Sequence, residues 1–210
     1  MIKKTIRGHK RIWKDIDAWK ERYSRISAEN LDRKYVKVWV YPYYDYTFGN
    51  SDLLEPKRET RRRILNGLHD IHDAWQKELD TLKQPYYLKI WLFEPRFSLS
   101  QVVCAVGEWT DYYDNTFFRP ESPKSFPLQN YGNLQDRLKD FSWEHGLDEA
   151  WIDENSIGTP GEFVSEAEFY ANRRWVKRKL AGPLRKMANE EGETFFFKMG
   201  NVWIGERKDK

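Results

Sequence analysis

Four carboxylates in the middle of the chain have the clearest capacity for metal chemistry. They follow two apolar segments, 87–94 and 101–107, or end them. Clustered carboxylates can hold Mg²⁺ for phosphoryl transfer or nuclease chemistry. If the ends of the two segments meet, the sequence predicts a metal site formed by Glu94, Glu108, Asp111 and Asp114. Because no Asp…Glu-x-Lys pattern follows on these segments, we favour the alternative of an acidic surface that binds a basic partner.

Basic side chains gather in two other segments of the chain. Five of the seven residues 57–63 are Lys or Arg, and a helix expected over 165–186 carries a basic face with a tryptophan among its cations. Such residues can neutralise phosphates and stack a base. A nucleic-acid site would use Arg61, Arg62, Arg174, Trp175, Lys177, Arg178 and Arg185. The alternative is a solvated face whose Lys and Arg stems cover apolar surface, and the near-balanced net charge favours it.

The remaining candidates for chemistry are weaker. His69 and Asp73 are four residues apart on an expected helix, with His72 beside them, but no third metal ligand is identifiable. Cys104 lies in an apolar strand pattern and is expected to be a small buried residue. The chain contains no GxxxxGK, GxGxxG, GxSxG or HExxH motif. We therefore expect no cofactor, and a binding protein rather than an enzyme.

The composition bounds the class of protein. The 36 Lys and Arg nearly balance the 33 Asp and Glu, and aromatic residues make up 16% of the 210 residues. A single cysteine excludes an intrachain disulfide. The first ten residues have no apolar segment behind their positive charges, so we expect no signal peptide, and the sequence has no apolar run as long as a membrane span. We expect a soluble, cytoplasmic chain that has no membrane partner and folds as one domain over 1–210, with an irregular insertion at 109–132.

The expected elements alternate between helices and strands. The two apolar segments carry apolar residues on both faces, which is typical of strands inside a sheet. The sequence therefore predicts an α+β fold with a mixed or antiparallel sheet of about five strands, covered by helices and ending in a C-terminal β-hairpin. Helices are expected over 11–28, 56–82, 134–144, 147–152 and 165–180, the last resuming to 189, and strands over 35–41, 87–94, 101–107 and 194–205, with a turn at Gly200-Asn201.

The first half of the chain contains two segments of similar sequence. Residues 35–41 match residues 87–93 in character position by position, and Asp-Ala-Trp occurs at 17–19 and again at 73–75. A duplication would explain this, as would convergence of neighbouring strands. We favour convergence, because only two copies exist and the linker lengths differ. Either explanation predicts that Lys37 and Lys89 reach the same side of the sheet.

Three functions remain as hypotheses from the sequence. The leading one is a non-enzymatic interaction protein that binds a protein partner through the aromatic, polar loops 43–52 and 109–132. The second is a nucleic-acid-binding accessory domain that uses the basic helix 165–186 and the cluster 57–63. The third is a metal-dependent enzyme that uses the four carboxylates.

Overall fold

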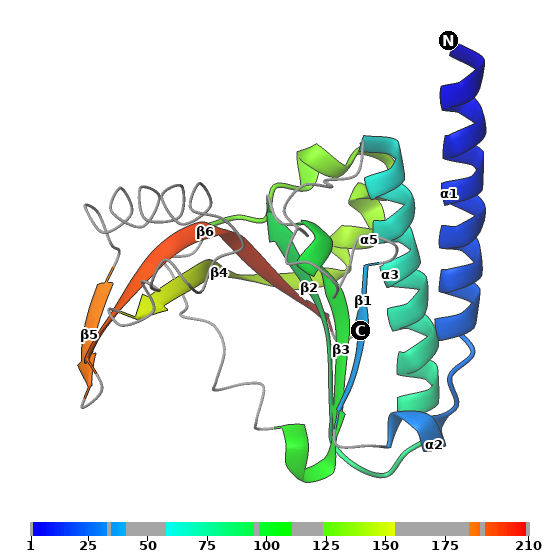
Figure 1. The fold of residues 1–210 in the computed structure, drawn as a ribbon. Helices are drawn as coiled ribbons and strands as arrows, with labels where there is room; N and C mark the ends of the chain where they lie inside the picture. Colours follow the sequence, from blue (N-terminus) through cyan, green and yellow to red (C-terminus); the bar gives the residue numbers. More distant parts are fainter. Residues whose placement is uncertain are drawn as a thin grey trace, which may run out of the picture. The chain divides into compact units, whose positions relative to one another are not determined.

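The computed structural model describes residues 2–32, 35–40, 58–94, 97–110, 124–153, 185–189 and 192–208. The chain divides into two compact units, one formed by Met1–Gly146 with Asn201–Lys210 and the other by Leu147–Gly200. The predicted α+β class is confirmed, since helices accompany an antiparallel sheet (Figure 1). None of the described helices has an apolar run long enough to span a lipid bilayer.

Strands β2 and β3 form the centre of the sheet in the first unit. The strand order is β1-β3-β2-β6-β4, so β3 and β2 each have a strand on both sides. Every residue of β3 is buried. This confirms the prediction that the two segments apolar on both faces lie inside the sheet. The strands are β1 (Val36–Trp39), β2 (Tyr86–Glu94), β3 (Gln101–Val106), β4 (Phe141–Asp153), β5 (Arg185–Asn189) and β6 (Gly192–Arg207).

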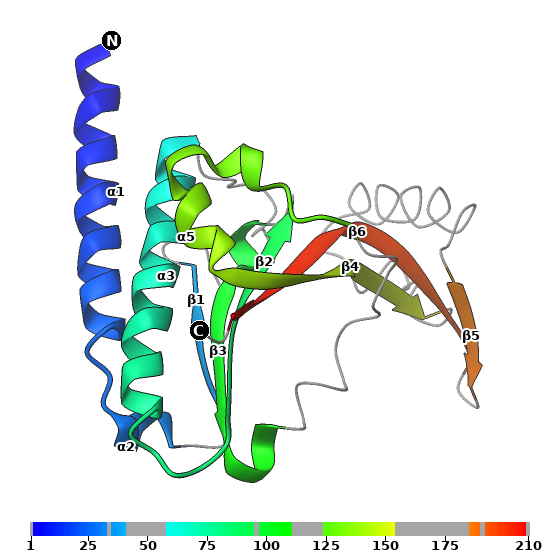
Figure 2. The ribbon, with the colours of Figure 1, turned by 180° about the vertical axis from the view of Figure 1, so that it is seen from behind.

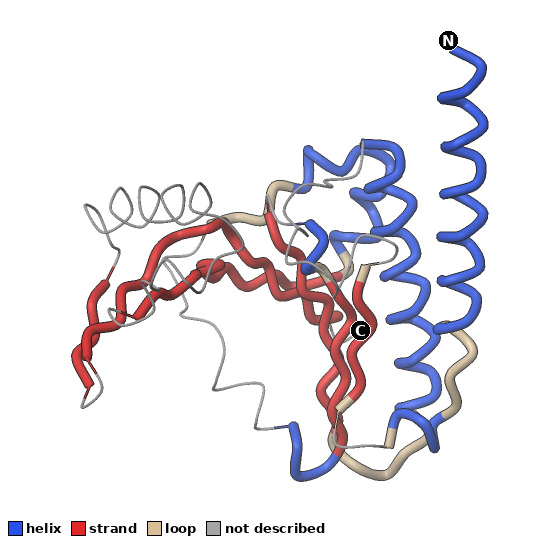
Figure 3. The backbone as a smooth tube through the Cα atoms, viewed as in Figure 1, coloured by secondary structure: helices blue, strands red, loops and turns tan. Residues whose placement is uncertain are grey.

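Helix α3 covers one face of this sheet and α1 packs on the outside of α3. Figures 1 and 2 show α3 between α1 and strands β1, β3 and β2, and Figure 3 shows these helices on one side of the strands. The longer helices are α1 (Ile2–Tyr23) and α3 (Arg58–Leu79), and the short ones are α2 (Ala28–Leu31) and α5 (Gln135–Lys139). Three 3-10 turns, η2 (Phe97–Leu99), η3 (Gly107–Trp109) and η4 (Leu128–Leu134), complete the described elements.

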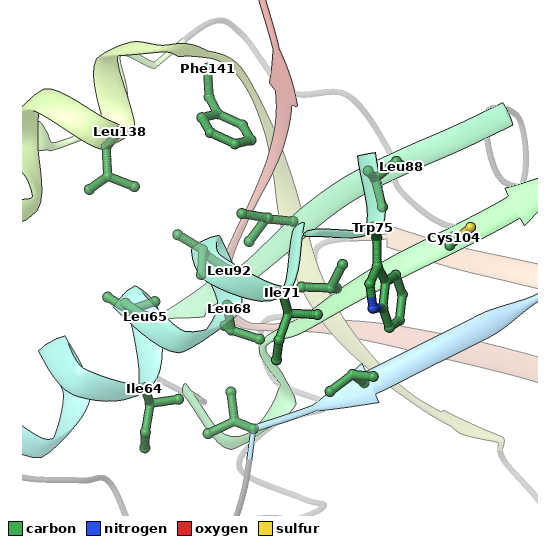
Figure 4. Close-up of a cluster of buried hydrophobic side chains, with 14 of the residues drawn as sticks. Ile64, Leu65, Leu68, Ile71, Trp75, Leu88, Leu92, Cys104, Leu138 and Phe141 are labelled. Carbon is green, nitrogen blue, oxygen red and sulfur yellow. The ribbon is translucent and has the colours of Figure 1, made fainter. Parts of the chain in front are cut away.

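The main core lies between α3 and the sheet. Apolar residues recur along α3 at intervals of three and four, which places them on one face of the helix. Figure 4 shows this face meeting side chains of β2 and β3, with Leu138 of α5 and Phe141 of β4 at one end. The buried members labelled there are Ile64, Leu65, Leu68, Ile71, Trp75, Leu88, Leu92, Cys104, Leu138 and Phe141.

Helices α1 and α3 run parallel to each other. Trp13 Nε1 donates to Thr60 Oγ1 at 3.4 Å, and Lys20 Nζ lies 3.2 Å from a carboxylate oxygen of Asp70. Trp75 Nε1 donates to the backbone oxygen of Tyr23 at 2.7 Å. The first turns of α1 consequently extend past the beginning of α3, as Figures 1 and 2 show.

Gly67 provides the space for the closest approach of these two helices. A Cβ added at Gly67 would lie 2.8 Å from the Cζ3 atom of Trp19, which is closer than real Cβ contacts. The Gly67→Ala variant should gain about 1 kcal/mol of helix propensity but lose about 1–3 kcal/mol to overpacking. We expect a net loss in the free energy of unfolding of about 1 kcal/mol, measured by urea denaturation. In a Trp19→Leu background the same change should become stabilising, and an unchanged loss there would contradict this explanation.

The similar segments 35–41 and 87–93 form strands in equivalent positions beside β3. Strands β1 and β2 pair with opposite edges of β3 in the same register, so Lys37 and Lys89 are both opposite Val103. This confirms that the two lysines lie on one side of the sheet. Lys37 Nζ lies 5.9 Å from the ring centre of Trp91, and Lys89 Nζ lies 3.1 Å from Glu206. The equivalence stops at the strands, since α3 packs on the sheet whereas α1 packs on α3.

Some boundaries predicted after residue 134 are wrong. Helix α5 ends at Lys139, and the residues expected to continue it to 144 and to form helix over 147–152 belong to β4. Burial alternates along the start of this strand: Phe141 and His145 are buried, and Ser142 and Glu144 are exposed. The helical spacing of Leu134, Leu138 and Phe141 had masked this period of two.

The C-terminal β-hairpin is confirmed, but its turn is elsewhere. β5 pairs antiparallel with β6, and Asn189 lies opposite Gly192, so Arg185–Asn189 is strand and not resumed helix. Gly200 and Asn201 lie within the continuous strand β6, because pairing with β2 keeps the backbone extended through Asn201 opposite Glu94. The helix predicted over 165–180 lies outside the described residues, as does loop 43–52.

Candidate functional site

The first turns of α3 bring four arginines to one end of the first unit. Two of them have partners. Arg61 Nη2 donates to Glu94 Oε1 at 2.7 Å, and its guanidinium lies 4.8 Å from the ring centre of Phe97. The Arg63 guanidinium lies 4.3 Å from the ring centre of Trp13. These contacts hold Arg61 and Arg63 against the protein.

Arg62 differs from these two neighbours. It forms no hydrogen bond or ion pair with any residue that the structure describes, and its Nε atom is buried. Its guanidinium packs against Gly132, where an added Cβ would overlap it. Gly132 has a φ of 54°, a backbone conformation that glycine adopts far more readily than other residues. The backbone of η4 therefore packs against an arginine that has no counter-ion within the described ranges.

Glu94, a predicted metal ligand, is instead bound by three donors. Besides Arg61, the Tyr131 hydroxyl donates to Oε1 at 2.5 Å, and Trp203 Nε1 donates to Oε2 at 3.3 Å. Burial and then the Glu94 charge raise the pKa of Tyr131 well above its ordinary value, so it stays a neutral donor. This carboxylate joins α3, η4 and β6 to the end of β2.

A pocket of about 420 Å³ opens beside these residues, and we name it the arginine pocket. Its lining carries three arginines and one carboxylate, which gives a formal charge of +2. A second pocket of about 380 Å³ lies on the α1 side and shares Arg62. The lining residues of the arginine pocket are Arg58, Arg61, Arg62, Leu65, Glu94, Gln129, Asn130 and Tyr131.

Aromatic stacking fixes the wall of the arginine pocket that η4 supplies. The Phe126 ring stacks on Tyr131 at 5.2 Å between centres and on Trp143 at 4.1 Å. It also meets Trp203 edge-on at 5.3 Å. In residues 124–132, the described end of the predicted insertion, the aromatic side chains thus pack against other aromatic side chains of the first unit. Gln129 and Asn130 remain exposed at the pocket.

The structure does not bring the two described acidic candidates together. Glu94 ends β2, whereas Glu108 follows β3 in η3 and is exposed. Because Tyr86 pairs with Val106 in an antiparallel ladder, Glu108 lies near the beginning of β2. Glu94 is at the other end of this strand, about 26 Å away at a rise of about 3.3 Å per residue. Asp111 and Asp114 lie outside the described residues. Within the described ranges, no group of three or more His, Cys, Asp or Glu is placed to hold a metal ion.

The predicted nucleic-acid residues are only partly described. Arg61 and Arg62 lie at the arginine pocket, and Arg185 is the first residue of β5 in the second unit. Arg174, Trp175, Lys177 and Arg178 lie outside the described residues. The sequence cluster 57–63 indicated the arginines, but Gln129, Asn130 and Gly132 had no local signal. The tertiary fold alone brings Gln129 and Asn130 to the arginine pocket and Gly132 to Arg62.

The histidines of α3 are buried beneath the aromatic ring of Phe141. His69 and His72 lie 4.8 and 4.9 Å from it between ring centres. Burial first, and then the charge of Arg137, lowers the pKa of His69 to about 3, so it is neutral near pH 7. Burial alone would raise the pKa of Asp73, but His72, Arg207 and Arg137 hold it well below its ordinary value. Arg137 Nη2 lies 3.1 Å from Asp73 Oδ2, so the cluster is a packed polar junction between α3, α5 and β6.

Cys104 has the environment that the sequence predicts. It is fully buried in β3, and burial raises the pKa of its thiol to about 12. A thiol in this environment stays protonated and is a poor nucleophile.

Comparisons of this chain with protein-family models, with curated proteins and with solved structures gave no match.

Proposed function

We propose that the chain is a nucleic-acid-binding protein whose phosphate contacts lie at the basic end of the first unit, defined as residues 2–14 of α1 and 58–63 of α3. One observation carries the proposal. Arg62 is held at the edge of two pockets without a counter-ion among the described residues. A partly buried guanidinium without an anion is costly, and a phosphate would satisfy it by charge-assisted hydrogen bonds.

The charge of this end supports a polyanionic ligand. Residues 2–14 contain six Lys and Arg and no Asp or Glu, and residues 58–63 contain four Arg and one Glu. Because α1 and α3 run parallel, the beginnings of both helices lie toward the same end (Figure 1). Cations at a helix N-terminus oppose the helix dipole, so this arrangement has a cost to folding that ligand binding would explain.

Nucleic acid is favoured over an acidic protein partner by the kind of cation present at the beginning of α3. Arginine presents a planar fork of donors that matches phosphate oxygens, and all four basic residues of 58–63 are arginines. Loop 43–52, which the protein-partner hypothesis needs, lies outside the described residues. In the described part of 109–132, Tyr131 is buried and Phe126 is half-buried. A cytoplasmic location remains part of this proposal.

Replacing Arg62 with alanine tests the proposal directly. We expect the affinity for a single-stranded or duplex oligonucleotide to fall about 10-fold or more, since a hydrogen bond to a charged group contributes about 1.5–3 kcal/mol. The slope of log affinity against log salt should become shallower by about 0.7–0.9, the value of one lost phosphate contact. Fluorescence anisotropy across a salt series measures both quantities.

Arg22→Ala is the matched control for this measurement. Arg22 is exposed in the last turn of α1, away from the beginning of α3, and its replacement removes the same formal charge. It should leave the affinity and the salt slope nearly unchanged. Absence of binding by the unmodified chain at low salt would refute the proposal, and binding only of an acidic peptide would replace it with a protein partner.

A further inference from the structure

We infer that the arginine pocket binds the terminal phosphate monoester of a nucleic-acid strand. The inference rests on the proposed function and specifies its ligand, since other phosphates of the strand would contact the rest of the basic end. The pocket has about 420 Å³ of space, which lies within the range of pockets that enclose small molecules or single chemical groups.

The charge of the pocket matches a monoester better than a phosphodiester. Three arginines and Glu94 give its lining a formal charge of +2. A phosphate monoester carries about −1.5 to −2 at pH 7, whereas each phosphate within a strand carries a single negative charge. Arg61 is already neutralised by Glu94 at 2.7 Å. The two positive charges left over belong to Arg58 and Arg62, neither of which has an ion pair with a described residue.

The positions of these two arginines suit a group with several free oxygens. Arg58 and Arg62 are four residues apart on α3, so their side chains emerge from neighbouring positions on the same side of the helix. A guanidinium group that binds in a bidentate way uses two acceptor oxygens. Two such groups are therefore poorly served by a phosphodiester, which has only two non-bridging oxygens. A terminal phosphate offers three acceptor oxygens. The side-chain amides of Gln129 and Asn130 provide further donors at the same pocket.

The buried residues in the lining of the pocket also favour a strand end. Leu65 and Tyr131 are buried, and Glu94 is tied to Arg61, Tyr131 and Trp203, so these residues form a fixed wall. The chain of a phosphodiester must leave on both sides of the phosphate, and one of those sides would meet this wall and its carboxylate. A terminal phosphate has its strand on one side only.

The test compares strands that differ only at their ends, using the full chain. Fluorescence anisotropy at one salt concentration would measure the affinity of the protein for three twelve-nucleotide strands of the same sequence. One strand has a 5′-phosphate, one has a 3′-phosphate, and one has hydroxyls at both ends. A fourteen-nucleotide strand with hydroxyl ends carries the same total charge as the phosphorylated strands and controls for charge alone. We expect one phosphorylated strand to bind about tenfold more tightly than both hydroxyl strands, as one added charge-assisted contact provides.

Variants assign this preference to the pocket. Arg62→Ala should abolish it, while Arg22→Ala should retain it, with circular dichroism showing that both variants are folded. Equal affinity for phosphorylated strands and the fourteen-nucleotide strand would overturn the inference and leave the proposed function intact. A preference that persists in Arg62→Ala would also overturn it. Failure of every strand to bind would overturn the proposed function and the inference with it.

Discussion

Replacing Trp75 with alanine is expected to lower the free energy of unfolding by about 3–5 kcal/mol. Trp75 is fully buried between α3 and the sheet, as Figure 4 shows. The substitution removes the largest fully buried side chain of the core and leaves a cavity that its neighbours can fill only in part. It also removes the hydrogen bond at 2.7 Å to the backbone oxygen of Tyr23, which connects α3 to the end of α1. Urea denaturation followed by circular dichroism measures the loss.

Two further variants separate the parts of this effect. Trp75→Phe keeps an aromatic ring but leaves the Tyr23 oxygen without its donor, so we expect an intermediate loss of about 1–3 kcal/mol. Lys77→Ala changes an exposed residue of the same helix and should stay within about 0.5 kcal/mol of the unmodified chain. If Trp75→Ala were as stable as Lys77→Ala, the described core would be wrong.

The stability of the protein should fall as the pH decreases below about 6.5 because of His69. Its pKa is about 3 in the folded chain, and its ordinary value is 6.5. Between these two values the unfolded chain binds a proton at His69 that the folded chain does not. The free energy of unfolding therefore decreases by about 1.4 kcal/mol per pH unit over this window from His69 alone. Above pH 6.5 the residue is neutral in both states and contributes no pH dependence.

The variant His69→Leu isolates this contribution. The Nε2 atom of His69 is buried and has no hydrogen-bond partner among the described residues. Replacing the imidazole with leucine therefore breaks no hydrogen bond at Nε2. We expect the difference in stability between variant and unmodified chain to be constant above neutral pH and to move steadily in favour of the variant from about pH 6.5 to about pH 4. Asp73 also faces this cluster, but its lowered pKa places its own loss of stability below the ordinary carboxyl value of 3.8. If the free energies of unfolding of the variant and the unmodified chain changed in parallel between about pH 6.5 and about pH 4, the assignment to His69 would be wrong.

The fold shows which kinds of sequence pattern are reliable in this chain. The two segments apolar on both faces identified the central strands, because burial on both sides of a sheet requires apolar residues at every position. The helical spacing from Ile64 to Leu79 identified α3 for a different reason, because only one face of this helix is buried and apolar residues recur there at intervals of three and four. The pattern failed from Leu134 to Phe141, where three apolar residues fit a helix although the chain turns into a strand after Lys139. Short apolar runs fit both periods, and only the neighbouring strand decides between them.

The site shows the same division between local and tertiary information. The sequence by itself determined the class of the fold, its central strands and the cluster of arginines at the beginning of α3, since these depend on periodicity and composition. It did not determine the separation of Glu94 from Glu108, because antiparallel pairing sends the ends of β2 and β3 in opposite directions. Only the tertiary structure decided that Glu94 neutralises Arg61 while Gly132 accommodates Arg62, which has no ion pair with a described residue. Glu94 and Gly132 are each more than 30 residues away in the chain from the arginine that they contact. Burial of the core brings them together, since no local sequence preference acts over such a separation.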